Sequence, residues 1–459
     1  MPNTIQTKRG PAANWTSTDP TLAAGEFGFE TDTGKFKVGN GSDAWSALGY
    51  FEPAAAAVFS PALAFTLDNP NAYDTVAGDQ FGRASSISGN YAIVGAPYED
   101  DASGTSSGKA YIFNVTTGAL LHTLNNPNPY STSATDYFAW SVAISSDYAI
   151  VGAYGEDDAG GTESGKAYIY NVTTGTLLYT LNNPNAYDTV ANDEFGRIVA
   201  ISGDYAIVGA HKEGDASGIQ SGKAYIFNVT TGALVHTLDN PNPYDTSLSD
   251  NFGTSVAISG DYAVVTAHQE DDAGGTQSGK AYIYNVTTGA LLHTLDNPNA
   301  YDTSRNDQFG NLVAISGNYA VVAARYEDDA GGTQSGKAYI YNVTTGALVH
   351  TLDNPNPYDT SANDTFGSSV AVSGNYAIVS ALGEGDADGI YSGKAYIFDV
   401  TTGALVHTLD NPNPYGTSET DNFGWSVGIS DNYAIVGSNA EDEAGGNTSG
   451  KAYIYSLYA

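Results

Sequence analysis

The chain has 459 residues, enough for more than one domain, and carries 51 Asp and Glu against 16 Lys and Arg, a formal net charge of −35. This charge repels polyanions and argues against a nucleic-acid partner. The absence of cysteine excludes disulfides and Cys-based metal or redox sites. We expect no secretion signal, since the residues after Met1 lack an apolar core, and no membrane span, since the apolar run 54–59 is too short.

The first predicted unit, residues 1–53, reads as a small β module. Residues 22–41 are a strand, a turn, a second strand and a second turn, and Trp45 follows them. A segment this short buries little apolar surface alone, so we expect partners or self-association to stabilise it. The alternative is a module that caps the domain after it. Residues 54–61, with their alanine run, are expected to form a linker.

This unit resembles a known attachment module. Its stretches KRG at residues 8–10 and GEFGFETDTGKFKVGNG at residues 25–41 are similar to the N-terminal module of phage tail fibres and tropism-determinant proteins. In that family the module attaches a receptor-binding protein to the virion, often as a trimer. The resemblance implies docking to other virion or tail proteins, a homotrimer, and an extracellular location in the phage tail. It also implies synthesis in the host cytoplasm without a signal peptide.

Residues 62–459 hold a repeat of fixed length. A phenylalanine, followed by glycine except in the second copy, recurs every 57 residues, at Phe81, Phe138, Phe195, Phe252, Phe309, Phe366 and Phe423. Each copy contains four short β-rich runs joined by two tight turns and one longer loop; in the fourth copy the runs are 255–258, 262–265, 280–286 and 290–295. The repeat predicts an all-β, seven-bladed β-propeller with one four-stranded blade per copy.

The two ends of the repeat array predict that the propeller closes into a ring. The last copy stops at Tyr455 without a fourth run, whereas residues 62–67 match the fourth run of the first copy, residues 119–124. The strand that precedes the first copy should therefore complete the seventh blade. A closed ring leaves only short, protected sheet edges.

The repeats resemble the FG-GAP repeat of integrin α-chain propellers and their bacterial relatives, on Phe-Gly, Val-Ala-Ile-Ser-Gly-Asp-Tyr-Ala-Ile-Val-Gly-Ala and Lys-Ala-Tyr-Ile-Tyr. The resemblance is specific for fold but not for function. Calcium-binding members carry Asp-x-Asp-x-Asp-Gly between the first two strands. Here that connection is Ser-Gly-Asp-Tyr or a close variant, which has too few oxygen donors to hold Ca²⁺. We therefore predict no metal ligands and no cofactor.

Acidic residues gather in a different loop of each copy, for example Glu99, Asp100 and Asp101. We favour ion pairs with the repeated lysines, such as Lys109, or solvation, because exposed oxygen clusters without a defined cage bind Ca²⁺ weakly. Weak divalent-cation binding by these loops stays open as the alternative.

The residues that differ between copies mark the candidate site. They stand just after Phe-Gly and just after the second strand, which are hairpin neighbours on one face of the ring. The basic residues of the propeller outside the repeated lysines, which include Arg305, all lie on this face. Trp, Tyr and Arg are common anchors of recognition surfaces and suit stacking on sugar rings; the alternative is neutral drift. The candidate ligand-binding residues are Arg83, Tyr98, Trp140, Tyr154, Arg197, His211, Lys212, His268, Arg325, Tyr326 and Trp425.

These observations favour a bacteriophage tail-fibre or receptor-binding virion protein, whose propeller binds a host surface glycan or protein. A purely structural virion protein is the main alternative. A glycan depolymerase is less favoured: carboxylates such as Asp193 and Glu194 abound, but acidic residues recur as scaffold and no nucleophile–base pattern appears, so we predict no catalytic residue and no enzyme activity. A bacterial adhesin is disfavoured by the missing secretion signal.

Overall fold

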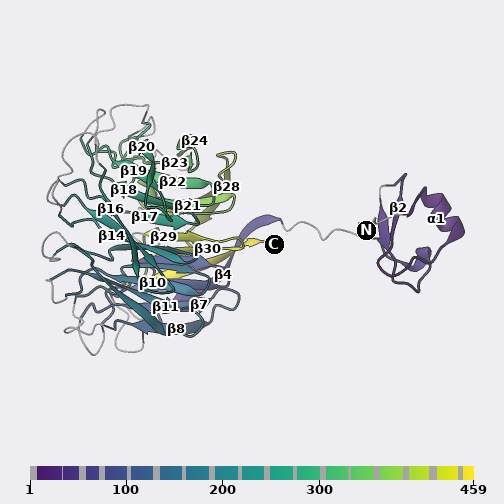
Figure 1. Cartoon of the computed structure of the whole chain (residues 1–459), viewed down its shortest axis with the longest axis horizontal. Helices are drawn as coiled ribbons and strands as arrows, with labels where there is room; N and C mark the ends of the chain where they lie inside the picture. The colour runs from purple at the N-terminus through teal and green to yellow at the C-terminus, as the bar shows by residue number, and fades with distance from the viewer. Residues whose placement is uncertain are drawn as a thin grey trace. The chain divides into compact units, whose positions relative to one another are not determined.

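The structure, a computed structural model of the chain, divides into two units, Met1–Phe59 with Ala459, and Ser60–Tyr458 (Figure 1). It describes residues 8–33, 35–50, 58–71, 78–100, 105–127, 135–157, 162–185, 192–214, 220–241, 249–271, 276–299, 306–328, 332–355, 362–385, 392–412, 421–442 and 448–459. None of the helices in these ranges is long and apolar enough to cross a membrane.

The described residues of the first unit form a three-stranded sheet, a helix and a 3-10 turn. Strand β1 (Lys8–Gly10) runs parallel to β2 (Phe27–Glu30), which pairs antiparallel with β3 (Phe36–Val38). Helix α1 (Ala12–Thr18) and the turn η1 (Trp45–Ala47) supply two stacked indole rings, Trp15 and Trp45, whose centroids are 4.3 Å apart. Together with Leu22 and Leu48 they make a very small core, which agrees with a module that needs partners. The hairpin lies inside the predicted range 22–41, whereas α1 and β1 were not predicted.

The described residues of the second unit form seven four-stranded antiparallel sheets, so the predicted seven-bladed propeller is confirmed. Blade 1 contains β5 (Ala84–Ser88), β6 (Tyr91–Ala96), β7 (Lys109–Asn114) and β8 (Leu120–Asn125). Blade 2 contains β9 (Ser141–Ser145), β10 (Tyr148–Ala153), β11 (Lys166–Asn171) and β12 (Leu177–Asn182). Blade 3 contains β13 (Ile198–Ser202), β14 (Tyr205–Ala210), β15 (Lys223–Asn228) and β16 (Leu234–Asp239). Blade 4 contains β17 (Val256–Ser259), β18 (Tyr262–Ala267), β19 (Lys280–Asn285) and β20 (Leu291–Asp296).

The remaining blades repeat this order. Blade 5 contains β21 (Val313–Ser316), β22 (Tyr319–Ala324), β23 (Lys337–Asn342) and β24 (Ala347–Asp353). Blade 6 contains β25 (Phe366–Ser373), β26 (Tyr376–Ala381), β27 (Lys394–Asp399) and β28 (Leu405–Asp410). Blade 7 contains β29 (Phe423–Ile429), β30 (Tyr433–Ser438), β31 (Lys451–Tyr458) and β4 (Phe59–Asp68).

Strand β4 closes the ring as predicted. It pairs with β31 as the fourth strand of blade 7, where Leu67 is buried and Asp68 pairs with Lys451. The inner strand β5 also contacts the inner strand β29 of that blade. Residues 59–61, placed in the linker by sequence, belong to β4. The reason is that β31 is longer than the third strand of the other blades and offers these residues a partner.

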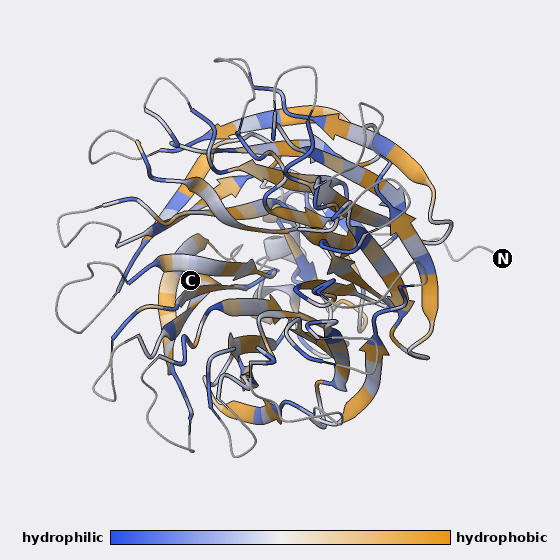
Figure 2. Ribbon diagram, turned by 90° about the vertical axis from the view of Figure 1, so that its left-hand side faces the viewer, coloured by the Kyte–Doolittle hydropathy of each residue, from blue (hydrophilic) through white to orange (hydrophobic). Residues whose placement is uncertain are grey.

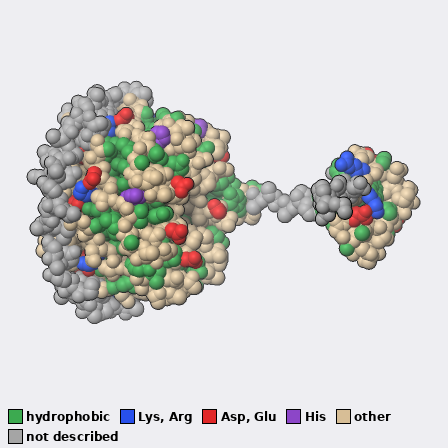
Figure 3. All heavy atoms as spheres, viewed as in Figure 1, with side chains coloured by type: hydrophobic (Ala, Val, Ile, Leu, Met, Phe, Trp, Pro, Cys, Tyr) green, Lys and Arg blue, Asp and Glu red, His purple; other side chains and the backbone are tan. Residues whose placement is uncertain are grey.

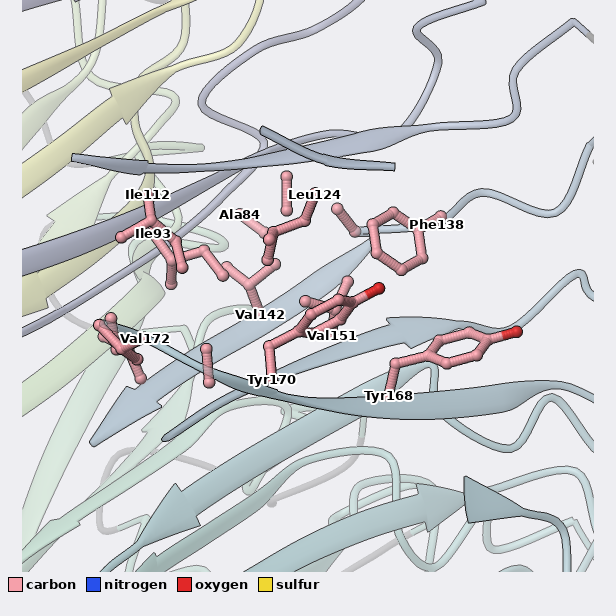
Figure 4. Packing of buried hydrophobic residues seen from close by; sticks show 14 of the residues in the cluster. Ala84, Ile93, Ile112, Leu124, Phe138, Val142, Val151, Tyr168, Tyr170 and Val172 are labelled. Carbon is pink, nitrogen blue, oxygen red and sulfur yellow. The ribbon is translucent and has the colours of Figure 1, made fainter. Parts of the chain in front are cut away.

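The apolar core lies between neighbouring blades. Figure 4 shows one such layer, in which Ile93 and Ile112 of blade 1 face Val142 and Tyr170 of blade 2. Phe138 is fully buried in the same layer. Its ring centroid is 5.8 Å from that of Tyr168, a tyrosine of the same blade that occurs at this position in every copy. The Phe-Gly motif is therefore an inter-blade joint. The outer strands, by contrast, are rich in apolar residues (Figure 2) and expose apolar side chains on the outer wall (Figure 3). The exposed residues include Leu120, Leu121, Leu177, Leu178, Leu234, Leu291 and Leu292.

Many of the acidic residues belong to the repeated scaffold. Glu99 is fully buried, accepts a hydrogen bond from the Tyr111 hydroxyl at 2.6 Å and pairs with the Lys109 ammonium at 2.5 Å. Asp100 accepts the Ser106 amide at 2.8 Å. The glutamates at the equivalent position are all fully buried, at Glu156, Glu213, Glu270, Glu327, Glu384 and Glu441.

These contacts confirm the ion-pair interpretation for Glu99–Lys109, and Glu156–Lys166 at 3.2 Å repeats it. In the ranges that the structure describes, no group of three or more His, Asp or Glu side chains is arranged to hold a metal ion. Asp101 lies outside the described residues.

The two faces of the propeller differ in their connections. We call the face at which the inner strands begin the entry face, and the opposite face, which carries the tight turns such as residues 89–90, the turn face. At the centre of the turn face, a cavity of about 310 Å³ is lined by the ends of all seven inner strands. The propeller's first strand, β4, begins at the turn face and ends at the entry face beside Lys451.

Candidate functional site

The first variable position of each copy lies on the entry face, where the inner strand begins. Arg83, Trp140 and Arg197 immediately precede β5, β9 and β13, and Trp425 lies in β29. A tight turn fixes each backbone, for example through the Arg83 amide to the Gln80 carbonyl at 3.1 Å. Inner strands of consecutive blades contact one another, so these side chains come from adjacent positions around the central axis.

Arg83 lies between two tryptophans from the neighbouring blades. Its guanidinium carbon is 3.7 Å from the Trp140 ring centroid and 5.0 Å from that of Trp425. The ring of Tyr98, in the same blade as Arg83, is 5.9 Å away. All three distances fall within the range of cation–π attraction. Both tryptophans of the propeller therefore contact one arginine.

Tyr137 and Tyr154 of blade 2 extend the aromatic surface towards Arg197 of blade 3. The rings of Tyr137 and Tyr154 are stacked, with centroids 5.3 Å apart and an interplanar angle of 11°. Trp140 meets Tyr154 edge-on at 4.9 Å, and the Arg197 guanidinium carbon is 5.4 Å from the Tyr154 centroid. We call this set the aromatic–arginine cluster; its members are Arg83, Tyr98, Tyr137, Trp140, Tyr154, Arg197 and Trp425.

A buried carboxylate organises the basic side chains at the edge of this cluster. Glu194, only 4% exposed, pairs with Arg197 at 2.6 Å and with Lys212. Burial alone would raise the pKa of Glu194, but the hydrogen bond from Lys212 and the charge of Arg197 outweigh it and lower the pKa. His211 Nε2 is 3.6 Å from the same carboxylate. Burial, followed by the charge of Arg197, lowers the pKa of His211 to about 3, so this contact involves a neutral imidazole at neutral pH.

The fold that carries this cluster has known relatives. The repeat segments 71–113, 129–170, 185–227, 242–284, 299–341, 356–398 and 414–455 each match the FG-GAP repeat. The chain belongs to the FG-GAP repeat family. The predicted resemblance is thus confirmed over most of the propeller, and the site described above is a departure from the repeat that the copies share.

The N-terminal unit of this FG-GAP protein matches a phage family. Residues 5–43 match the major tropism determinant N-terminal domain. A hyaluronoglucosaminidase of Streptococcus pyogenes phage H10403 is 45% identical over 53 residues, which are 12% of this chain and 16% of that protein. The chain thus matches about a sixth of the relative's length. These matches indicate a phage tail- or tropism-related protein.

The remaining predicted site residues lie on blades 4 and 5 of the FG-GAP propeller. His268 Nδ1 is 3.0 Å from the Thr254 hydroxyl, and burial, with the charges of Arg325 and Arg197, lowers the pKa of His268 to about 4. The Arg325 guanidinium lies 4.6 Å from the ring of Tyr326, and its Nε is buried without a hydrogen-bond partner in the described part of the chain.

The structure brings six of the predicted residues into the cluster, namely Arg83, Tyr98, Trp140, Tyr154, Arg197 and Trp425. His211 and Lys212 adjoin it through Glu194. Among the described contacts, none joins Arg325 or Tyr326 to its rings. Arg305 lies outside the described residues.

Sequence reasoning missed two members of the site, Tyr137 and Glu194. Both immediately precede the repeated phenylalanine, where the other copies carry Gln80, Asn251, Gln308, Thr365 and Asn422. The variation at this position could have predicted that it belongs to the site, because the position just after Phe-Gly varies between copies in the same way. Tyr137 and Glu194 have positive φ angles of 52° and 54°. This conformation is uncommon for residues other than glycine, and its presence could not be inferred from the sequence.

Proposed function

We propose that this protein is a receptor-binding component of a phage tail, in which the N-terminal unit docks on the particle and the entry face of the propeller binds a host surface glycan or protein. The aromatic–arginine cluster carries this proposal. Scaffold residues recur in all blades, whereas each residue type of the cluster occurs at its position in at most two of the seven copies, and the side chains still meet at one place. Trp, Tyr and Arg dominate the binding energy of recognition surfaces.

The path of the chain supports this orientation. Strand β4 begins at the turn face, so the connection to the N-terminal unit enters the propeller from the face opposite the cluster. We further propose a homotrimer, in which three such faces on one particle would convert weak contacts into avidity.

We propose binding without cleavage. Hydrolysis of a glycoside usually requires two carboxyl groups that flank the bond. Glu194 is held by Arg197 and Lys212, and Asp193 accepts the side-chain amides of Asn183 and Asn185 at 2.8 and 2.7 Å. The amide contact to Asp193 recurs in other blades, for example from Asn126 to Asp136, so this carboxylate acts as scaffold. The match to the phage hyaluronoglucosaminidase covers 12% of this chain, which is too little to assign that enzyme's activity to it.

Competition for adsorption tests the proposal. Host cells preincubated with a saturating amount of the purified chain should adsorb the parent phage at least tenfold more slowly, whereas a Trp140→Ala/Trp425→Ala chain should not compete. Mass spectrometry of purified particles should detect the chain. Its absence from the particle would contradict the proposal. Its presence without any competition would favour the structural alternative, in which the entry face is buried between virion subunits.

A further inference from the structure

Arg83, like Arg325, differs from the other described cations of the propeller. Each repeated lysine pairs with a carboxylate, as Lys109 does with Glu99, and Arg197 and Lys212 share Glu194. Among the described residues, Arg83 has no carboxylate partner, and its recorded side-chain hydrogen bond is a long one, 3.3 Å from Nη1 to the neutral amide oxygen of Gln80. Of the chain's 51 acidic residues, none in the described ranges gives Arg83 the counter-ion that Arg197 and Lys212 have.

The surroundings make an unpaired cation unfavourable. Arg83 is half-buried against Trp140, and burial, with the repulsion from Arg197, lowers its pKa below the usual value. An arginine remains protonated in proteins, so the charge persists and has lost part of its hydration. Cation–π attraction to the indole faces offsets part of the hydration free energy that Arg83 has lost. A hydrogen-bonded anion would offset more of this lost hydration free energy, because a charge-assisted bidentate pair is stronger than a neutral hydrogen bond.

We infer that Arg83 receives a carboxylate of the ligand, and that the ligand is an acidic saccharide whose sugar rings lie on Trp140, Trp425 and Tyr98. This inference rests on the receptor-binding function proposed above and narrows its ligand class. The Arg83 guanidinium carbon lies 3.7 Å from the Trp140 ring centroid and the residue keeps part of its surface exposed, so we place the anion at the edge of the guanidinium. A planar carboxylate can place both oxygens in the plane of the guanidinium. A phosphate can also pair with it bidentately, so phosphorylated saccharides are the competing ligand class in the test.

The net charge of the protein does not prevent this contact. Interactions between exposed charges are screened beyond about 8 Å at physiological ionic strength. Arg83 of blade 1 and Arg197 of blade 3 both lie against Trp140 of the blade between them. The field that a bound carboxylate experiences is therefore set mainly by Arg83, because Glu194 already pairs with Arg197. The attraction to Arg83 should weaken as salt is added, so binding should decrease with increasing ionic strength.

The test uses the full chain on a glycan array of matched pairs. Each pair holds a uronic-acid oligosaccharide and its carboxyl-reduced, neutral counterpart, and phosphorylated saccharides form a third group. We expect binding to acidic members, with their reduced partners at least tenfold weaker. Arg83→Gln should lower affinity about 10- to 100-fold, as expected for loss of a charged hydrogen bond. Arg83→Lys should recover only part of it. Arg9→Gln, which makes the same charge change in the N-terminal unit, should bind like the wild type.

The outcomes separate this inference from the function on which it rests. Equal binding to acidic and reduced members, or preference for phosphorylated saccharides, would overturn the carboxylate assignment while leaving receptor binding intact. Equal affinities of Arg83→Gln and wild-type protein, with unchanged melting temperatures, would overturn the role of Arg83. If the chain binds neither the array nor host cells, the proposed function itself fails.

Discussion

Deleting residues 1–68 is expected to unfold or aggregate the propeller, because it removes the strand that closes the ring. Without β4, blade 7 loses the buried Leu67, worth about 1.5–3 kcal/mol. Lys451, whose side chain is 3% exposed, also loses its partner Asp68. Because the Asp68 side chain is 65% exposed, we expect the loss of this pair to add about 1 kcal/mol. The deletion also leaves β31 as an unpaired edge, which is a template for association with other chains.

The matched control is deletion of residues 1–57, which removes the N-terminal unit but keeps all of β4. We expect its propeller to melt within a few degrees of that of the full chain, as followed by scanning calorimetry and size-exclusion chromatography. A monomeric, cooperatively melting protein after deletion of residues 1–68 would show that β4 does not close the ring.

The propeller is expected to lose stability as the pH rises from 5 to 9. Burial raises the pKa of Glu327 to about 8 and the pKa values of Glu156, Glu384 and Glu441 to about 7. A carboxyl group whose pKa is raised by folding binds its proton more tightly in the folded chain. Its contribution to stability is present in full below the unfolded pKa, near 4.5, and is lost as the pH passes the folded pKa. Each pKa unit corresponds to about 1.4 kcal/mol per group.

A neutral substitution isolates one of these groups. Glu327→Gln retains an acceptor for the Tyr339 hydroxyl, which now donates to the carboxylate at 2.7 Å, but it cannot titrate. We expect its melting temperature relative to the wild type to be higher at pH 9 than at pH 5. Glu163→Gln, the same change at an exposed position, should follow the wild type at every pH. A wild-type melting temperature that increases from pH 5 to 9 would contradict this account.

The architecture could be predicted because its determinants are local and repeated. The Phe-Gly spacing and the two-residue turns specify a blade without knowledge of any distant contact, and the unmatched run before Phe81 revealed the closing strand. Helix α1 escaped prediction because its seven residues show no amphipathic period; it buries a single large side chain, Trp15, against Trp45. The parallel strand β1 was missed because it has three residues and its partner β2 follows only after helix α1 in the sequence.

The site was only partly predictable for a different reason. Alternation along hairpins correctly places Trp140 next to Tyr154 and Thr254 next to His268. Contacts between blades depend on the radius of the ring and on rotamers, which the sequence does not specify. The position of Arg83 between tryptophans of blades 2 and 7 is of this kind. The pairing of Glu194 with Lys212 is also unspecified by the sequence, because it depends on the positive φ angle of Glu194.

The most direct test of the central claim is the binding of the fluorescently labelled full chain to cells that the parent phage infects, measured by flow cytometry. The comparison is with Trp140→Ala/Arg325→Ala/Trp425→Ala on the entry face and with Leu120→Ala/Leu234→Ala/Leu291→Ala on the outer wall. We predict that the wild type and the outer-wall variant bind equally, and that the entry-face variant binds at least tenfold more weakly at an unchanged melting temperature. Equal binding by all three proteins, or no binding by any of them, would contradict a receptor-binding entry face.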